Sequence, residues 1–294
     1  MISVYYQVRH LKTTDGTKYP LNYSTMTFSG GEEQVRIHPI DALPFFDKPT
    51  FETKFFITIC APFINSSKEL IQLLLIHNAV RRLFLVKETE FVLELGYIPY
   101  ARQDRVCYPG EAFSAEVLAS LLQTMYTDVL IVKDPHSNVI LSLLQQKSVF
   151  TQVVDQSVCF DLTMIDAGVP PGTYDYVIAP DKGAAIKASK VAKNIGASLL
   201  QATKVRDTDT GKICGIEFER DDIDLTNKKA IVVDDICDGG RTFIELAKTL
   251  ECHTRYDRLD LYITHGIFSK GKEILLECFD NIYTHNEMKQ GEDL

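Results

Sequence analysis

Three aspartates and a pair of glycines stand close together in the stretch AIVVDDICDGGRTF, which covers residues 230–243. The apolar run before them is typical of a buried strand, and the residues from Thr242 onward have apolar side chains at helical spacing. A loop at the carboxyl end of a parallel strand is where open α/β sheets bind their ligands. This loop is therefore the first place in the sequence where we expect chemistry.

The glycines and the residues after them suit an anion. Gly239 and Gly240 allow backbone N–H groups to turn toward a ligand, and the helix that follows adds a partial positive charge at its first turn. Thr242 contributes a hydroxyl donor. This half of the loop predicts a phosphate-binding cradle.

The carboxylates of the same loop need a different target, because Asp234 and Asp235 would repel a phosphate. Carboxylates suit the vicinal hydroxyls of a sugar or a water molecule on Mg²⁺. A sugar phosphate together with a metal ion satisfies both halves of the loop. The competing interpretation is a turn in which aspartate and glycine serve only backbone geometry, and the flanking strand and helix disfavour it.

The elements that must position this loop are predicted strands and helices that alternate along the chain. Short β-branched or aromatic runs, several of them ending in a loop, are predicted as strands at 51–62, 91–99, 128–137, 174–181, 197–205, 228–235 and 258–266. Helical periodicity is found at 66–83, 112–125, 183–195 and 242–250. Such alternation predicts βαβ units, parallel sheets and an α/β fold. We expect two domains, residues 1–148 and 149–294.

The composition excludes several classes of protein. The chain of 294 residues has a net charge of -9, which disfavours nonspecific binding to nucleic acid or to a membrane surface. Its seven cysteines are scattered singly, which favours a reducing compartment over a disulfide framework. No apolar run approaches the ~20 residues that span a bilayer, and the N-terminus lacks the apolar core of a signal peptide. We expect a soluble, cytoplasmic protein with no nucleic-acid or membrane partner.

The stretch VVDDICDGGRT resembles the phosphoribosyl-pyrophosphate loop of two families, the type I phosphoribosyltransferases and the ribose-phosphate pyrophosphokinases (PRPP synthetases). Further segments resemble the second family, in matching order over roughly residues 25–285. They are FSGGEEQVRI (28–37), YIPYARQDR (97–105), VKDPHS (132–137), APDKGA (179–184) and THGIFSKG (264–271). YIPYARQDR resembles the stretch that holds ATP, and phosphoribosyltransferases have no equivalent of it. The chain is thus identified as a divergent member of the ribose-phosphate pyrophosphokinase family.

The resemblance implies two domains of type I phosphoribosyltransferase-like fold, each with a mainly parallel sheet flanked by helices. The first domain would be the ATP side, and the second would carry the sugar-phosphate loop and the catalytic loop. The implied reaction is a Mg²⁺-dependent transfer of the β,γ-diphosphoryl group of ATP to the 1-hydroxyl of ribose 5-phosphate, giving PRPP and AMP. The resemblance also implies a homo-oligomer with an adenine site shared between subunits, in nucleotide or NAD synthesis.

The family's functional residues can be carried over by position. The implied catalytic residues are Lys204 and Arg206, at the root of a polar loop. The implied ATP-binding residues are Phe28, Glu32, Arg102, Gln103, Asp104 and His136. The implied Mg²⁺ ligands are His136 and Asp181. The implied sugar-phosphate residues are Asp234, Asp235, Asp238, Gly239, Gly240, Arg241 and Thr242. The chemistry relies on positioning and charge neutralisation, since phosphoryl transfer needs no covalent catalysis.

Arg241 departs from the family's pattern, which has a threonine, two glycines and a threonine after the third acid. An arginine can grip a phosphate bidentately, and it also adds bulk where the 5-phosphate ends. A second hypothesis is therefore ADP-ribose as the acceptor, in the same chemistry and for NAD salvage. An arginine turned away from the sugar pocket would count against that hypothesis.

Two hypotheses keep the fold but change the activity. A non-catalytic regulatory paralogue should have lost the transfer apparatus, whereas Lys204, Arg206, His136 and Asp181 are all present. A phosphoribosyltransferase would consume PRPP and has no ATP to bind, so the YARQDR segment counts against it. Release of AMP from ATP is expected of a PRPP synthetase and of neither of these two alternatives.

Overall fold

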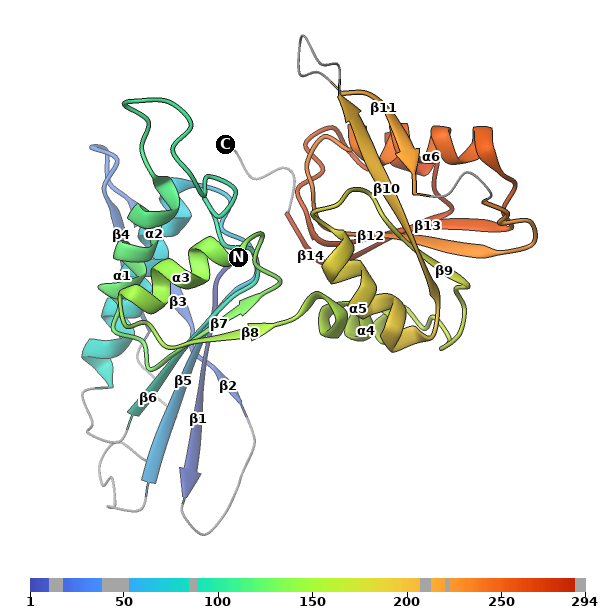
Figure 1. Ribbon diagram of the computed structural model, residues 1–294. Coiled ribbons are helices and arrows are strands. Elements are labelled where there is room, and N and C mark those ends of the chain that lie inside the picture. The colour runs from blue at the N-terminus through green and yellow to red at the C-terminus, as the bar shows by residue number, and fades with distance from the viewer. Residues whose placement is uncertain (11–17, 39–52, 85–88, 207–212, 220–222, 289–294) are drawn as a thin grey trace. The chain divides into compact units, whose positions relative to one another are not determined.

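The chain forms two compact units, the first ending at Val153 and the second beginning at Val154. The computed structural model describes residues 1–10, 18–38, 53–84, 89–206, 213–219 and 223–288 (Figure 1). We call the two parts unit 1 and unit 2. Among the described residues, no helix has both the length and the apolar character needed to cross a membrane.

Unit 1 is built on a sheet of six strands. Across the sheet they are β2 (Tyr19–Pro20), β1 (Ser3–His10), β5 (Thr53–Ala61), β6 (Thr89–Leu95), β7 (Val129–Lys133) and β8 (Thr151–Val154). The central strands β5, β6 and β7 run parallel, whereas β1 is antiparallel to β5. Beside the sheet lie a hairpin of β3 (Tyr23–Thr27) and β4 (Glu33–Ile37), and the helices α1 (Ser67–Leu83), α2 (Ser114–Gln123) and α3 (Asn138–Gln146).

Helix α1 begins where the sequence predicts it. The hydroxyl of Ser66 caps the helix by accepting a hydrogen bond from the Glu69 N–H at 3.2 Å. The helix buries Leu70, Leu73 and Val80 in the core of unit 1. In the strands the burial alternates instead, so that one face of β5, β6 and β7 packs against the helices.

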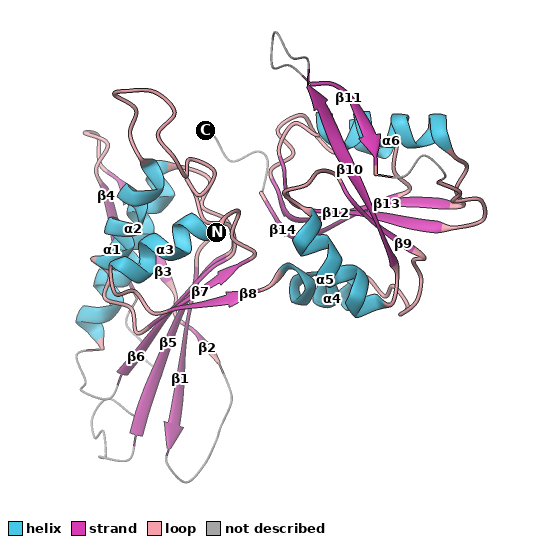
Figure 2. Cartoon of the chain, viewed as in Figure 1, coloured by secondary structure: helices cyan, strands magenta, loops and turns pink. Residues whose placement is uncertain are grey.

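Unit 2 has a second sheet of six strands, and in Figure 2 helices lie on both sides of it. Its strands, in order across the sheet, are β11 (Ile213–Phe218), β10 (Ser198–Arg206), β9 (Tyr176–Ala179), β12 (Lys229–Cys237), β13 (Arg258–Gly266) and β14 (Asn281–Glu287). All neighbouring pairs are parallel except β10 with β11. The helices are α4 (Gln156–Asp166), α5 (Ala185–Ile195), α6 (Arg241–His253) and α7 (Glu273–Leu276).

The continuous apolar run in β12 is explained by burial on both faces of this sheet. Val232 belongs to the same core cluster as Phe243 and Leu246 of α6. Its neighbours Ile231 and Val233 belong to a second cluster, with residues of α4 and α5. A parallel strand that is covered on both sides needs apolar residues at successive positions. The predicted α/β fold with two mainly parallel sheets flanked by helices is therefore confirmed.

Candidate functional site

The candidate sugar-phosphate site of unit 2 lies at the point where the order of strands reverses. From β9 the chain continues to β10 on one side, while β12 and β13 lie on the other side of β9. Asp181 follows β9, and Asp234 and Asp235 lie near the carboxyl end of β12, which is parallel to β9. These acids therefore share the edge of the sheet where α/β proteins bind ligands.

The two adjacent acids of β12 have different partners. Asp234 accepts a hydrogen bond from the Asp235 N–H through Oδ1, at 2.9 Å. The Oδ2 of Asp235 lies 3.3 Å from the Nζ of Lys187, a residue of α5, and the two side chains are only 13% and 28% exposed. The lysine offsets the charge of one of the two neighbouring acids. Lys187 was not predicted as a site residue, because a lysine in a helix usually indicates a solvated face.

The loop after β12 is held by the loop after β13. Ser269 donates a hydrogen bond through Oγ to Asp238 Oδ1 at 2.6 Å, and its N–H donates to the Asp238 carbonyl at 3.2 Å. The Cε of Lys270 lies 3.6 Å from where a Cβ on Gly239 would be. Gly240, at φ 74°, is the N-cap of α6. The sequence did not predict Ser269 and Lys270, although both lie in the segment THGIFSKG.

Arg241 does not extend into the cradle as a free cation. It is the first residue of α6, and its Nε lies 2.6 Å from Oε1 of Glu245, one helical turn further on. Its side chain is 80% exposed. The guanidinium is therefore turned along the outside of the helix. This leaves the backbone N–H groups at the start of α6, together with the half-buried Thr242, as the anion donors.

Cys237 lies between the paired acids and the glycines but is not available as a nucleophile. Burial, and then the nearby carboxylates of Asp234 and Asp238, raise the pKa of this thiol to about 12. The thiol is therefore protonated at neutral pH and unreactive. Its buried position fits the role of a small residue that fills space in the loop.

Asp181 lies at the candidate site and also forms a hydrogen bond with the backbone. Its Oδ1 accepts a hydrogen bond from the Ala184 N–H at 3.1 Å, in the turn that leads into α5. The described residues contain no group of three or more histidine, cysteine or acidic side chains that forms a metal site by itself. Mg²⁺ in phosphoryl-transfer sites is usually held by one or two carboxylates and the phosphates of the substrate. The all-oxygen donors of Asp181, Asp234 and Asp235 fit that pattern.

Lys204 and Arg206, the predicted catalytic residues, lie at the end of β10. Lys204 is paired with Ile216 of β11 and Arg206 with Ile213, and the register shifts between Val205 and Arg206. The side chains of both residues, and the loop 207–212 that follows them, lie outside the described part of the chain. Their catalytic role stays a prediction.

In unit 1 the predicted ATP residues divide between two places. Arg102, Gln103 and Asp104 follow β6, and His136 follows β7, the parallel neighbour of β6. These four residues thus belong to one edge of the sheet. Arg102, Gln103 and His136 are exposed, and Asp104 is half-buried.

The remaining predicted ATP residues, Phe28 and Glu32, lie in the turn between β3 and β4. The N–H of Phe28 donates to the carbonyl of Glu32 at 2.8 Å, which closes the turn. The Phe28 side chain is 48% exposed. Glu33, at the base of the turn, accepts a hydrogen bond from Gln72 of α1 at 2.7 Å. The hairpin thus presents Phe28 to its surroundings from a fixed base.

The chain is similar to several known proteins. A family model described as the phosphoribosyl transferase domain matches residues 167–254, which include the β12–α6 loop. Ribose-phosphate pyrophosphokinase of Saccharolobus solfataricus is 30% identical over 62% of this chain and 58% of its own length. The enzyme of that name from Pyrococcus furiosus is 26% identical over 95% of this chain and 90% of its own length.

The matched region covers 58% and 60% of the Saccharolobus solfataricus and Sulfurisphaera tokodaii proteins, so it spans less than two thirds of those relatives. The crystal structure of phosphoribosylpyrophosphate synthetase from Mycobacterium smegmatis shares the fold. Its TM-score is 0.65 at 22% identity, over 88% of this chain and 78% of that one. Its motifs, its fold and these relatives support a divergent member of the ribose-phosphate pyrophosphokinase family.

Proposed function

We propose that this chain is a ribose-phosphate diphosphokinase that makes PRPP and AMP from ribose 5-phosphate and ATP. The observation that carries the proposal is the β12–α6 loop, where Asp234 and Asp235 stand next to the N-terminus of α6 at the switch point of the sheet. Carboxylates for sugar hydroxyls and N–H donors for a phosphate lie side by side there. A ribose phosphate carries hydroxyls and a phosphate, so a site for it needs carboxylates and N–H donors within one loop.

In this proposal the sugar binds to unit 2 in two parts. The ribose hydroxyls donate to Asp234 and Asp235, and the ion pair with Lys187 holds Asp235 in place. The 5-phosphate accepts from the backbone N–H groups between Asp238 and Thr242. Lys270 extends over Gly239 and adds a positive charge at this cradle. The sugar is thereby fixed with its 1-hydroxyl free to react.

The transfer itself forms one bond and breaks another. The 1-hydroxyl oxygen of the sugar attacks the β-phosphorus of ATP, and its proton is lost to solvent. The bond from the β-phosphorus to the oxygen that bridges it to the α-phosphate breaks, and AMP leaves with the electron pair on that oxygen. Lys204 and Arg206 would neutralise charge on the transferred group, and Mg²⁺, when bound, supplies further neutralisation.

The nucleotide would be held by residues of unit 1. Arg102, Gln103 and Asp104, together with His136, lie beyond the ends of neighbouring strands and suit a triphosphate and its metal ion. We further propose that Phe28 and Glu32 contact the adenine of a neighbouring subunit in a homo-oligomer. The exposed Phe28 ring at the tip of the hairpin supports this role.

ADP-ribose is less well supported as the acceptor. It requires a cation for the second phosphate beyond the cradle, and Arg241 is the residue that suggested it. The guanidinium of Arg241 is instead paired with Glu245 on the outside of α6. This pairing favours ribose 5-phosphate as the acceptor.

The test is release of AMP from ATP and Mg²⁺, with ribose 5-phosphate or ADP-ribose as the acceptor. We expect release with ribose 5-phosphate only, and a loss of about 100-fold or more in Lys204→Ala, since a cation at the transferred group acts in the transition state. Lys248→Ala, at an exposed position of α6, is the matched control and should keep full activity.

Two results would contradict the proposal. Release that depends on ADP-ribose would move the protein to NAD metabolism. Binding of ATP without release of AMP from either acceptor would indicate the regulatory paralogue.

A further inference from the structure

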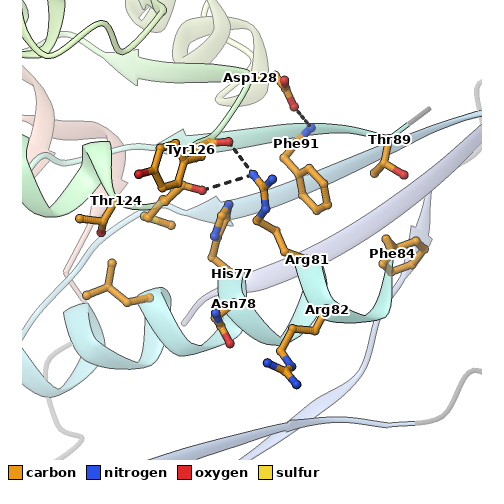
Figure 3. Close-up of a pocket in the computed structure, with 12 residues that line it drawn as sticks. His77, Asn78, Arg81, Arg82, Phe84, Thr89, Phe91, Thr124, Tyr126 and Asp128 are labelled. Atoms are coloured by element: carbon orange, nitrogen blue, oxygen red, sulfur yellow. Dashed lines mark hydrogen bonds between the residues drawn. The ribbon is translucent and has the colours of Figure 1, made fainter. Parts of the chain in front are cut away.

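Unit 1 contains a hollow at the edge of its sheet where β6 and β7 begin (Figure 3). It has a volume of about 710 Å³, which is in the range of small-molecule sites. It lies between the second half of α1, the start of β6 and the connection from α2 to β7. The residues on which the argument rests are His77, Arg81, Thr89, Phe91, Tyr126 and Asp128. The predicted ATP residues follow the opposite ends of the same strands.

Two buried polar atoms of this hollow have no hydrogen-bond partner among the described residues. They are Nε2 of His77 and Oγ1 of Thr89. His77 is only 3% exposed. Six such side-chain atoms occur in the described part of the chain, and two of them line this one hollow. Buried polar groups are almost always hydrogen-bonded, so a pair of them in one cavity points to a ligand.

Two arginines, Arg81 and Arg82, line the hollow, and Arg81 has only neutral partners among the described residues. Arg81 donates through Nη1 to the carbonyl of Tyr126 at 2.6 Å, and its guanidinium lies 4.9 Å from the centre of the Phe91 ring. No described carboxylate forms an ion pair with it. Asp128 also lines the hollow, where its Oδ2 accepts a hydrogen bond from the Phe91 N–H at 2.7 Å, and the two arginines outnumber this one carboxylate. The hollow therefore favours a ligand with a negative charge.

The rim of the hollow carries a strained aromatic residue. Tyr126 has φ 51°, a conformation that costs energy for a bulky side chain, and its ring is 76% exposed. Arg81 holds the carbonyl of this same residue. In Figure 3, His77 and Arg81 rise side by side from α1 toward the strand that carries Phe91. Strain of this kind is concentrated at ligand sites.

We propose that this hollow binds a small organic anion, whose charged group accepts hydrogen bonds from Arg81 and whose remaining polar atoms bond to His77 Nε2 and Thr89 Oγ1. Burial, and then the charge of Arg81, lower the pKa of His77 to about 4. The ring is therefore neutral at pH 7, and it can donate or accept a single hydrogen bond at Nε2. The site is independent of the diphosphokinase activity proposed above, because none of its residues belongs to the ATP or sugar-phosphate segments.

The experiment follows the ring resonances of His77 by NMR in the full chain, assigned by their loss in His77→Leu. Three probes separate the sources of the charge: inorganic phosphate, citrate, and 3-phosphoglycerate, which carries both a phosphate and a carboxylate. We expect at least one organic probe to shift His77 with a Kd below about 1 mM. The shift should persist in the presence of saturating ATP.

Thr89→Val decides between a ligand site and a merely imperfect core. The substitution keeps the shape of the side chain and removes an unpaired hydroxyl, so the thermal midpoint should hold or rise. Binding of the probe should nevertheless weaken about tenfold, since one hydrogen bond is lost. Thr25→Val, on the exposed strand β3 of the same unit, should leave binding unchanged. The proposal is overturned if no probe shifts His77, if Thr89→Val binds as the wild type does, or if ATP displaces the probe.

Discussion

The two sheets have the same number of strands but differ in how deeply they are buried. In unit 2 every residue of β13 from Leu259 to Gly266 is buried, whereas β7 of unit 1 alternates buried with half-exposed residues. The candidate sites follow the same division. Around β12 the side chains are fixed by the protein's own contacts, such as Lys187 with Asp235. The ATP segment of unit 1 instead leaves Arg102 and His136 exposed.

This difference indicates which contacts hold the site residues of each unit in place. A site whose residues are locked by surrounding contacts needs little reorganisation when the substrate binds. An exposed side chain has fewer surrounding residues whose substitution could displace it. We therefore expect the sugar-phosphate side to be sensitive to single substitutions of supporting residues, and the ATP side to be more tolerant of them.

The largest effect should come from removing one charge of the paired acids. In Asp235→Asn, Lys187 loses its partner and the sugar hydroxyls lose an acceptor, so kcat/KM for ribose 5-phosphate should fall about 100-fold, the cost typical of a misplaced reacting group. The KM for ATP should stay within about twofold if the two sides are independent. Steady-state AMP release at varied concentrations of each substrate measures both. Asp224→Asn, at an exposed position of unit 2, is the control, and an equal loss in it would refute the assignment.

A smaller effect should follow the loss of the lysine over the cradle. Lys270→Gln removes one charge from the phosphate site, and the KM for ribose 5-phosphate should rise about tenfold at unchanged kcat, because the contact exists before and during the transfer. The effect should shrink as salt screens the charge. Lys272→Gln is the matched variant, since Lys272 is paired with Glu287 instead. If kcat falls together with the affinity, Lys270 acts on the transfer step and our assignment is wrong.

The smallest effect should come from the ion pair that joins β6 to β7 below the ATP segment. Burial alone would raise the pKa of Glu94, but Lys133, whose Nζ lies 2.9 Å away, together with Cys60 outweighs it and lowers that pKa below its ordinary value. A carboxyl whose pKa is lowered by folding stabilises the fold above its unfolded pKa, and this stabilisation is lost as the pH falls through the folded pKa.

Lys133→Gln should therefore destabilise unit 1 at pH 7 by less than about 1 kcal/mol, and the difference from wild type should disappear as the pH falls through the lowered pKa of Glu94. Urea unfolding at several pH values measures this. Lys54→Gln, which removes a more exposed ion pair with Glu90, should have a smaller effect. A larger loss, or a loss that grows in acid, would contradict the comparison.

The sequence was most informative where local signals coincided. The apolar run and the glycines around β12, and the serine cap before α1, are short-range features, and the predicted elements formed there. The helix predicted at 242–250 is α6, which buries Phe243, Leu246 and Leu250 as expected. Sequence reasoning left the direction of Arg241 open, although Glu245 stands four residues later and pairs with it across one turn.

What sequence reasoning missed depends on contacts between distant residues. The edge strands β11 and β14, and the hairpin of β3 and β4, were not predicted, because short strands at edges take much of their stability from the partner strand. Lys187 is 48 positions from Asp235, so their pairing has no local signal. The same holds for Ser269, which reaches Asp238 from a different loop.

Asp181 and Asp235 are both held by contacts with helix α5 or with the turn before it. Asp181 holds the turn that leads into the helix, and Lys187 of the helix holds Asp235. A ligand that draws Asp181 away from its backbone partner shifts the helix, and with it the lysine. In the proposed function, a metal ion at Asp181 and a sugar at Asp235 would change each other's affinity by the same factor, because such linkage is reciprocal. Metal and sugar affinities of this protein should therefore be measured as a pair.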